Sequence, residues 1–485
     1  MNKQHSLSLR TEINRLIETR NLSRAKELLN NIRIEDVSRE DRHFFSALCR
    51  RINMNQLAME FVWDNIFEAK QFSAGDVEEY ANSLRKAGMQ RQALRMLGTI
   101  PKTQSVVMAQ AFCHITQWKY QDGLQCLLHA KDLQGNSPSD IISINLASCY
   151  TALNMFVPAL ELLESMLRSG IQTRNTNFYV NCLELQGQCL TRKGDYKNAK
   201  LVLEEAKATA LAKGEMDQNA LLIEKWLFIN DLAGNTLDAN SPRISELKKQ
   251  VRAVGHWESL RHIDYCLALK RGDSDLYKNV YFGTPFKTVF LDSINLGTPP
   301  PVGKNFLWKD ARHQESDAML LDLYRPDLPK VPLGMTSHRL LLLLASDFYR
   351  PWSVGQLFDN LFPDEFFNPF SSKKRVQKLV KSIREALQKS FNEHELVATD
   401  YGYRLRPLHR VVFLCYPQMV FSSQEEFILS GLRHYAKSDE LKIRDLNEIF
   451  FLSDDQWFRV LKKMTDAELI TSRGQGKGKT YNISK

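Results

Sequence analysis

Residues 371–406 have the sequence SSKKRVQKLVKSIREALQKSFNEHELVATDYGYRLR, and this stretch decides the fold of the C-terminal part of the chain. Its apolar residues recur at helical spacing, at Val376, Leu379, Val380, Ile383 and Leu387. The opposite face is polar and cationic, and Ser371 or Ser372 is a suitable N-cap. The pattern predicts an amphipathic helix over 372–389, followed by two short strands at 396–406 that close on Tyr401-Gly402-Tyr403.

The charge of this stretch is strongly positive. Residues 371–410 contain ten Lys or Arg and four Asp or Glu. An excess of this kind is typical of a nucleic-acid surface, because Lys and Arg neutralise phosphates. The alternative is a solvated helix face, which most charge runs are. Agreement of the helix, the hairpin and a second similar module further on favours the nucleic-acid interpretation.

The residues before this helix complete a recognisable order of elements. Met319 to Tyr324 is a candidate strand, Thr336 a candidate cap for a leucine-rich helix, and Ser353 with Gln356 a capping box. The order of helix, helix, helix and hairpin resembles the effector domain of OmpR/PhoB-type response regulators. The resemblance is carried by Arg375-Val376, Val380, Ile383-Arg384, Leu387 and Gly402-Tyr403-Arg404-Leu405. It implies a winged-helix DNA-binding domain at 315–410, with the basic helix in the major groove and the hairpin as the wing.

The resemblance also suggests roles for single residues. Arg375, Lys381, Arg384 and Tyr403 match positions that the family uses on phosphates, and Gln377, Lys378 and Ser382 match positions near bases. Leu379 and Thr399 depart from the family pattern, at a base-reading position and at a wing arginine respectively. These departures put sequence specificity in doubt and leave backbone binding intact, because phosphates need charge and carry no sequence information.

The loop at 362–370 is long and aromatic, with four phenylalanines in Phe-Pro-Asp-Glu-Phe-Phe-Asn-Pro-Phe. In the resembled family this loop can contact RNA polymerase. The alternative is that the phenylalanines fill the core of their own domain or of the neighbouring one.

Residues 411–485 indicate a second winged helix. A helix is expected from about Glu425 and another after the cap Ser453, followed by a basic glycine-rich loop at 473–479 and a strand at 480–483. Residues 422–470 carry ten acidic and seven basic residues, so this domain is expected to contact either DNA or protein. The Gly478-Lys479-Thr480 tripeptide offers a phosphate loop as an alternative, which is not expected because such a loop opens a helix. The candidate DNA-binding residues of both modules are Lys373, Lys374, Arg375, Gln377, Lys378, Lys381, Ser382, Arg384, Tyr403, Arg404, Arg406, Arg473, Lys477 and Lys479.

The first 280 residues show a helical repeat. A small residue near the start of the second helix of each pair recurs at 25, 58, 93, 123, 159 and 199, with spacings of 33, 35, 30, 36 and 40. A period near 34 with helix–turn–helix units resembles the tetratricopeptide repeat. The resemblance implies an α-solenoid whose concave face binds a protein, a peptide or its own chain, or serves as a scaffold alone. Residues 281–314 are proline-rich and are expected to be a linker.

Composition narrows the function classes. The net charge is +9, and the eight cysteines form no Cys-x-x-Cys pair, as expected for free thiols in a reducing cytosol. No apolar run is long enough for a membrane span, so a cytoplasmic location is expected. The histidines form no metal-spaced or catalytic cluster, and we expect no enzyme activity and no cofactor. His338 is expected to be a surface or capping residue.

Together these patterns predict a mostly α-helical chain, with a repeat solenoid at 1–280 and two winged-helix domains at 315–410 and 411–485. The function that fits is a bacterial transcription regulator, which binds double-stranded DNA and receives a protein or peptide signal on its repeats. The alternative is a non-enzymatic adaptor whose winged helices contact proteins.

Overall fold

The computed structural model describes residues 3–68, 73–135, 139–212, 218–286, 300–301, 303–309, 318–325, 328, 331, 333–392, 395–421, 423–436, 438, 440–450 and 452–484. The chain is mostly helical and divides into two compact units. The repeat unit comprises Met1–Val302 and Phe367–Lys373, and the C-terminal unit comprises Gly303–Phe366 and Lys374–Lys485.

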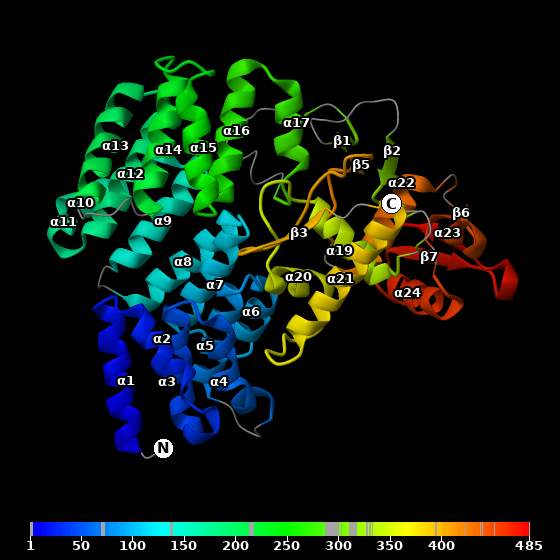
Figure 1. The fold of residues 1–485 in the computed structure, drawn as a ribbon, viewed down its shortest axis with the longest axis horizontal. Coiled ribbons are helices and arrows are strands. Elements are labelled where there is room, and N and C mark those ends of the chain that lie inside the picture. Colours follow the sequence, from blue (N-terminus) through cyan, green and yellow to red (C-terminus); the bar gives the residue numbers. More distant parts are fainter. Residues whose placement is uncertain are drawn as a thin grey trace. The chain divides into compact units, whose positions relative to one another are not determined.

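Helices follow one another in pairs along the repeat unit, in chain order from blue to green (Figure 1). The pairs are α1 (Lys3–Glu18) with α2 (Leu22–Asn30), α3 (Arg42–Arg51) with α4 (Asn55–Phe67), α5 (Ala74–Lys86) with α6 (Gln90–Leu97), α7 (Gln104–Thr116) with α8 (Tyr120–Gln134), α9 (Asp140–Ala152) with α10 (Phe156–Arg168), α12 (Thr176–Lys193) with α13 (Tyr196–Leu211), α14 (Gln218–Ala233) with α15 (Pro242–Ala253), and α16 (Trp257–Arg271) with α17 (Ser274–Phe282). A short α11 (Ile171–Arg174) precedes α12, and two 3₁₀ turns, η1 (Ile34–Asp36) and η2 (Arg39–Asp41), precede α3.

The predicted small residues are the points where paired helices meet. Ala25, Ala58, Ala93, Gly123, Ala159 and Ala199 all lie in the first turn of the second helix of a pair, and all are buried. A Cβ on Gly123 would lie 2.8 Å from Ile115 Cγ1 of the preceding helix, so a larger side chain has no room there. The helical-repeat prediction is confirmed at these positions.

A feature of the turns repeats with the same period. The residue five positions before each small residue has a left-handed backbone, with φ between 59° and 93°, at Arg20, Asn53, Gly88, Trp118, Asn154 and Gly194. The next residue donates its amide to the carbonyl five positions back, as in Met54 N to Cys49 O at 2.9 Å. These bonds satisfy carbonyls at the end of the first helix and turn the chain into the second.

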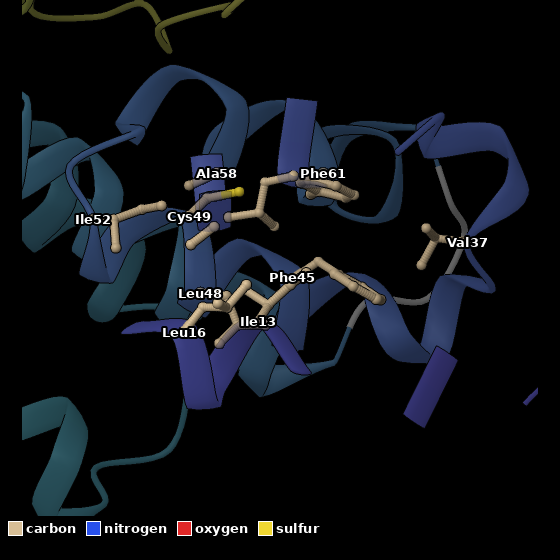
Figure 2. Close-up of a cluster of buried hydrophobic side chains, with 11 residues drawn as sticks. Ile13, Leu16, Val37, Phe45, Leu48, Cys49, Ile52, Ala58 and Phe61 are labelled. Atoms are coloured by element: carbon tan, nitrogen blue, oxygen red, sulfur yellow. The ribbon is translucent and has the colours of Figure 1, made fainter. Parts of the chain in front are cut away.

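Apolar side chains from neighbouring pairs pack into hydrophobic clusters along the repeat unit. Figure 2 shows the first of these clusters, where Ile13 and Leu16 of α1 meet Phe45 and Leu48 of α3. The rings of Phe45 and Phe61 stack at 5.7 Å. No pair could bury this surface alone, and stacking of neighbours therefore holds the array together.

The C-terminal unit contains helices and three small sheets in its described residues. Its helices are α19 (Met335–Ala345), α20 (Val354–Leu361), α21 (Ser372–Phe391, which begins in the repeat unit), α22 (Gln424–Tyr435), α23 (Ile443–Ile449) and α24 (Asp454–Asp466), with a 3₁₀ turn η4 (Gly476–Gly478). Its strands are β1 (Phe306–Trp308), β2 (Met319–Asp322), β3 (Leu396–Thr399), β4 (Gly402–Leu405), β5 (Val411–Cys415), β6 (Glu440–Leu441), β7 (Ile470–Arg473) and β8 (Thr480–Ile483).

The sheets have the orders β1-β5-β2, β3-β4 and β6-β8-β7. In the first sheet β5 runs antiparallel to β1 and parallel to β2. β1 lies inside the range 281–314 predicted as a linker, of which 287–299, 302 and 310–314 lie outside the described residues. β5 follows residue 410 and yet pairs with β2, so the sheet joins parts of the two predicted winged-helix domains. The predicted domain limits stay predictions.

Most predicted elements of this unit are present, and two predicted details are wrong. The capping box of Ser353 with Gln356 is confirmed, and so is the cap at Ser453, which the structure shows to be a capping box with Gln456. Thr336 is not a cap, because α19 begins one residue earlier, after Gly334 with extended backbone. His338 is buried and not a surface residue, because its Nε2 donates to Leu323 O at 2.6 Å.

Candidate functional site

The helix α21 has the predicted amphipathic build. Its apolar stripe packs inward, with Val376, Val380, Ile383 and Leu387 buried, while Leu379 is half-exposed. Among the predicted DNA-binding residues of this helix, seven are exposed to solvent. These are Lys373, Lys374, Arg375, Gln377, Lys378, Lys381 and Ser382. Of these, Lys381 has an acidic neighbour at 3.8 Å, Glu385, in an exposed pair that is worth little to stability.

Three of the predicted arginines have partners within the protein; Arg375 is exposed, whereas Arg384 and Arg404 are half-buried. Arg375 forms a two-bonded ion pair with Glu365 and lies 3.8 Å above the ring of Phe362. Arg384 Nη2 donates to Leu396 O at 3.0 Å, and Arg404 Nη2 donates to Phe348 O at 2.6 Å. These bonds fix the loop before α21 and the hairpin after it. The phosphate contacts predicted for these arginines stay predictions.

The hairpin is anchored at Gly402. Trp352 and Tyr403 exchange two backbone hydrogen bonds of 2.8 Å, which attach β4 to the segment before α20. Gly402 has φ of +137°, and a Cβ there would lie 2.2 Å from Trp352 O. Only glycine fits this position. Tyr401 at the hairpin tip is exposed, as is Arg406 after β4 at the other end of the hairpin, and Tyr403 is half-buried.

The second predicted module has a basic loop and a less basic helix. Arg473 is exposed at the end of β7, and Lys479 Nζ lies 5.2 Å from the ring centre of Tyr481. The side chain of Lys477 lies outside the described part of the chain. On α24, Asp454 and Asp455 occupy the first turn, and Phe458 is 72% exposed.

The repeat unit contains a pocket that the sequence did not reveal. Its volume is about 310 Å³, and its lining comes mainly from the first helices of consecutive pairs, α9, α12, α14 and α16. The charged and aromatic lining residues are Trp118, Tyr120, Glu184, Arg192, Lys225, Trp226, Glu258 and His262. The available signal was the presence of Glu184, Arg192, Lys225 and His262 in helices that are otherwise rich in apolar residues.

Burial sets the electrostatics of this pocket. It lowers the pKa of Lys225 to about 8, with the nearby Glu184 opposing that shift, and it lowers the pKa of His262 well below its usual range. Burial also raises the pKa of Glu184. Arg192 donates to Thr151 O at 2.7 Å, which holds its guanidinium at the wall. The indole Nε1 of Trp226 is buried without a hydrogen-bond partner, which is costly unless a ligand supplies an acceptor.

The described residues give no support for metal binding or for a reactive cysteine. They contain no group of His, Cys, Asp and Glu side chains that could hold a metal ion. The cysteines are free, and six of the eight are buried, as expected. Burial raises the pKa of Cys182 to about 12, so this thiol is not a nucleophile at neutral pH. No helix in the described ranges is long and apolar enough to cross a membrane.

Comparison with known proteins adds little. No protein-family model matches the chain. No curated protein matches it either. Among solved structures, the crystal structure of a Rap protein complexed with competence and sporulation factor matches 79% of this chain and 100% of that one. The two are 12% identical with a TM-score of 0.37, a likeness too weak to carry an argument about this chain.

Proposed function

We propose that the chain is a regulator of transcription, whose C-terminal unit binds duplex DNA as a winged helix and whose repeat unit receives a peptide or protein signal. The observation that carries this proposal is the face of α21. Lys374, Lys378 and Lys381 are exposed on one side of a helix whose other side is buried. A helix of this build fits a major groove, with its lysines against phosphates.

The hairpin supports the same proposal. Gly402 and the two bonds between Trp352 and Tyr403 hold β3 and β4 in place after α21. Arg384 and Arg404 stabilise the hairpin, because they donate hydrogen bonds to the carbonyls of Leu396 and Phe348 respectively. The exposed lysines, and not these arginines, are therefore the groups we assign to phosphate binding.

The test is the salt dependence of DNA binding by the full chain, measured by fluorescence anisotropy with a labelled duplex of mixed sequence. Each phosphate contact contributes about −0.9 to the slope of log K against log salt. The double substitution Lys378→Gln and Lys381→Gln should therefore reduce the slope by about 1.8. The matched control, Lys26→Gln with Lys249→Gln, removes the same charge from exposed positions of the repeat unit and should leave the slope unchanged. Absence of duplex binding at low salt would remove the DNA-binding half of the proposal.

For the repeat unit we propose a short peptide ligand in the pocket of about 310 Å³. The pocket offers both signs of charge, Arg192 and Lys225 beside Glu184 and Glu258, and two tryptophans. Peptides carry complementary charges and carbonyl acceptors that suit the indole of Trp226. Pockets lined by helices from several repeats are the usual ligand sites of solenoids.

A second candidate function is that of an adaptor, and α24 favours it. Asp454 and Asp455 repel phosphate, while Phe458 is exposed on the same helix. A neighbouring cavity of about 250 Å³ is lined by Phe458, Leu461 and Tyr481. Aromatic anchors of this kind are typical of protein interfaces. If α21 fails to bind DNA, protein contact through α24 becomes the better explanation of this unit.

A further inference from the structure

The segment that leads into α21 and includes its first two residues belongs to the repeat unit. Residues Phe367–Lys373 cluster with Met1–Val302, although the chain on both sides of them belongs to the C-terminal unit. The segment has the sequence Phe-Asn-Pro-Phe-Ser-Ser-Lys. Phe367 is 5% exposed, whereas Phe370 is 54% exposed. Phe367 of the aromatic loop is therefore buried, whereas Phe370 is not.

Side chains of three repeat helices bind the backbone of this segment. Gln92 Oε1 of α6 accepts from Phe367 N at 2.8 Å, and the hydroxyl of Tyr80 on α5 donates to Phe367 O. Gln56 Nε2 of α4 donates to Pro369 O at 3.2 Å. The backbone N–H and C=O of Phe367 are thus both hydrogen-bonded by side chains of one helix pair, α5 and α6.

The side chains of Tyr80 and Gln92 need a hydrogen-bond partner at this site. Tyr80 and Gln92 are fully buried, and burial raises the pKa of Tyr80 well above its usual range. The Tyr80 ring packs against Trp63 and Phe67, with ring centres 6.0 Å and 5.6 Å away. A hydroxyl placed inside an aromatic cluster is costly unless it has a partner, and the partner here is the carbonyl of Phe367.

Hydrogen bonds within the segment also hold its conformation. Asn368 Oδ1 accepts from the amides of Phe370 at 2.8 Å and Ser371 at 3.2 Å, and Ser372 Oγ accepts from Asn368 N at 2.9 Å. These bonds form a turn directly before α21, and the cap predicted at Ser371 or Ser372 stays a prediction. A preformed turn lowers the entropy cost of docking.

We propose that the site formed by Gln56, Tyr80 and Gln92 recognises a peptide, that Phe367–Pro369 is its internal ligand, and that a partner presenting a Phe-Asn-Pro segment competes for it. Competition would release the residues from which α21 begins. The site differs from the pocket around Lys225 and from the DNA-binding face. Its link to DNA binding rests on the function proposed above, whereas the recognition itself does not.

The test uses the full chain and a fluorescein-labelled peptide with the sequence of residues 364–372. In the unaltered protein the internal ligand competes at an effective concentration in the millimolar range, so the peptide should bind weakly. Phe367→Ala in the protein should open the site and tighten peptide binding about tenfold or more. A peptide with alanine in place of its second phenylalanine, the residue that corresponds to Phe367, should not bind. Equal peptide affinity for the Phe367→Ala and unaltered chains would overturn the proposal.

A second measurement avoids large changes to the core. Tyr80→Phe removes one hydroxyl, and Tyr179→Phe is its matched control, because the hydroxyl of Tyr179 bonds to Glu205 elsewhere in the unit. Tyr80→Phe should speed amide hydrogen exchange in 366–372 about five- to tenfold, the usual effect of one lost hydrogen bond, and the control should not. Unchanged exchange in Tyr80→Phe would contradict the proposal. Absence of duplex binding in the unaltered chain and in every variant, with peptide binding as expected, would reject only the function proposed above.

Discussion

Substitution of Gly402 by alanine tests the hairpin that follows α21. The position has φ of +137°, and the added Cβ would lie 2.2 Å from Trp352 O and 2.6 Å from Trp352 C. Both atoms belong to the backbone, so a side-chain rotation cannot relieve the clash. The segment around Trp352 and the hairpin must separate, and the two hydrogen bonds of 2.8 Å between Trp352 and Tyr403 are then lost.

The expected cost follows from these contacts. A residue held in a sparsely populated backbone region costs about 1–3 kcal/mol, and each lost hydrogen bond about 1 kcal/mol. Gly402→Ala should therefore lower the free energy of unfolding by about 3–5 kcal/mol. For a unit of roughly 150–250 residues this corresponds to a fall in melting temperature of about 6–20 °C.

The assay is differential scanning calorimetry of the full chain, with hydrogen exchange of peptides from 352–356 and 396–406 to assign the transition. Gly303→Ala is the matched control, because Gly303 has φ of +134° and a Cβ there meets its nearest atom, Asn305 O, at 3.6 Å. The control carries the backbone strain without the clash. A melting temperature for Gly402→Ala no lower than that of the control would refute the reasoning about the clash.

Three further outcomes are expected. Ala159→Leu should destabilise the repeat unit by about 1–3 kcal/mol in urea unfolding, because it overfills a contact between paired helices, whereas Val157→Leu on the exposed face of the same helix should change little. Burial lowers the pKa of His338 to about 4, so the fold favours the neutral ring; stability should be full above pH 6.5 and fall by about 3 kcal/mol as the pH drops from 6.5 to 4. Melting curves of His338→Gln between these pH values should show a smaller decline. Lys225→Met should abolish the thermal stabilisation that a mixed pentapeptide library gives the unaltered chain, and an equal shift in both proteins would exclude that pocket.

Local patterns predicted much of this structure. The apolar stripe of α21, the capping box at Ser353, the cap at Ser453 and the six small residues of the repeats each depend on residues close in sequence, and all are present. The limits of α21 are close to the predicted 372–389, because the stripe and the turn before it fix its start. The Gly402 hairpin follows equally from a short motif.

Contacts between residues far apart in the sequence could not be predicted. The sequence shows that Arg384 and Arg404 are cationic, and it does not show that their guanidinium groups bind the carbonyls of Leu396 and Phe348. His338 stands beside a leucine run, yet its burial depends on Leu323 in another element. The pocket around Lys225 needs helices from four pairs, and no periodic pattern specifies which inward positions stay polar. The aromatic loop was given two possible roles; burial of Phe367 agrees with the packing role, and contact with RNA polymerase stays a prediction.

The segment 367–373 belongs to the repeat unit but is synthesised later than the rest of that unit. During synthesis the first 302 residues emerge well before Phe367, and at about 5–20 residues per second the intervening 65 residues take roughly 3–13 s. For that interval Tyr80 and Gln92 lack the backbone groups that they bind in the finished protein. The nascent solenoid is thus incomplete until the ribosome has passed residue 369. For the same reason, a chain cut between 302 and 303 does not yield two intact halves, and expression of residues 1–302 alone should give a protein that aggregates more readily than the whole.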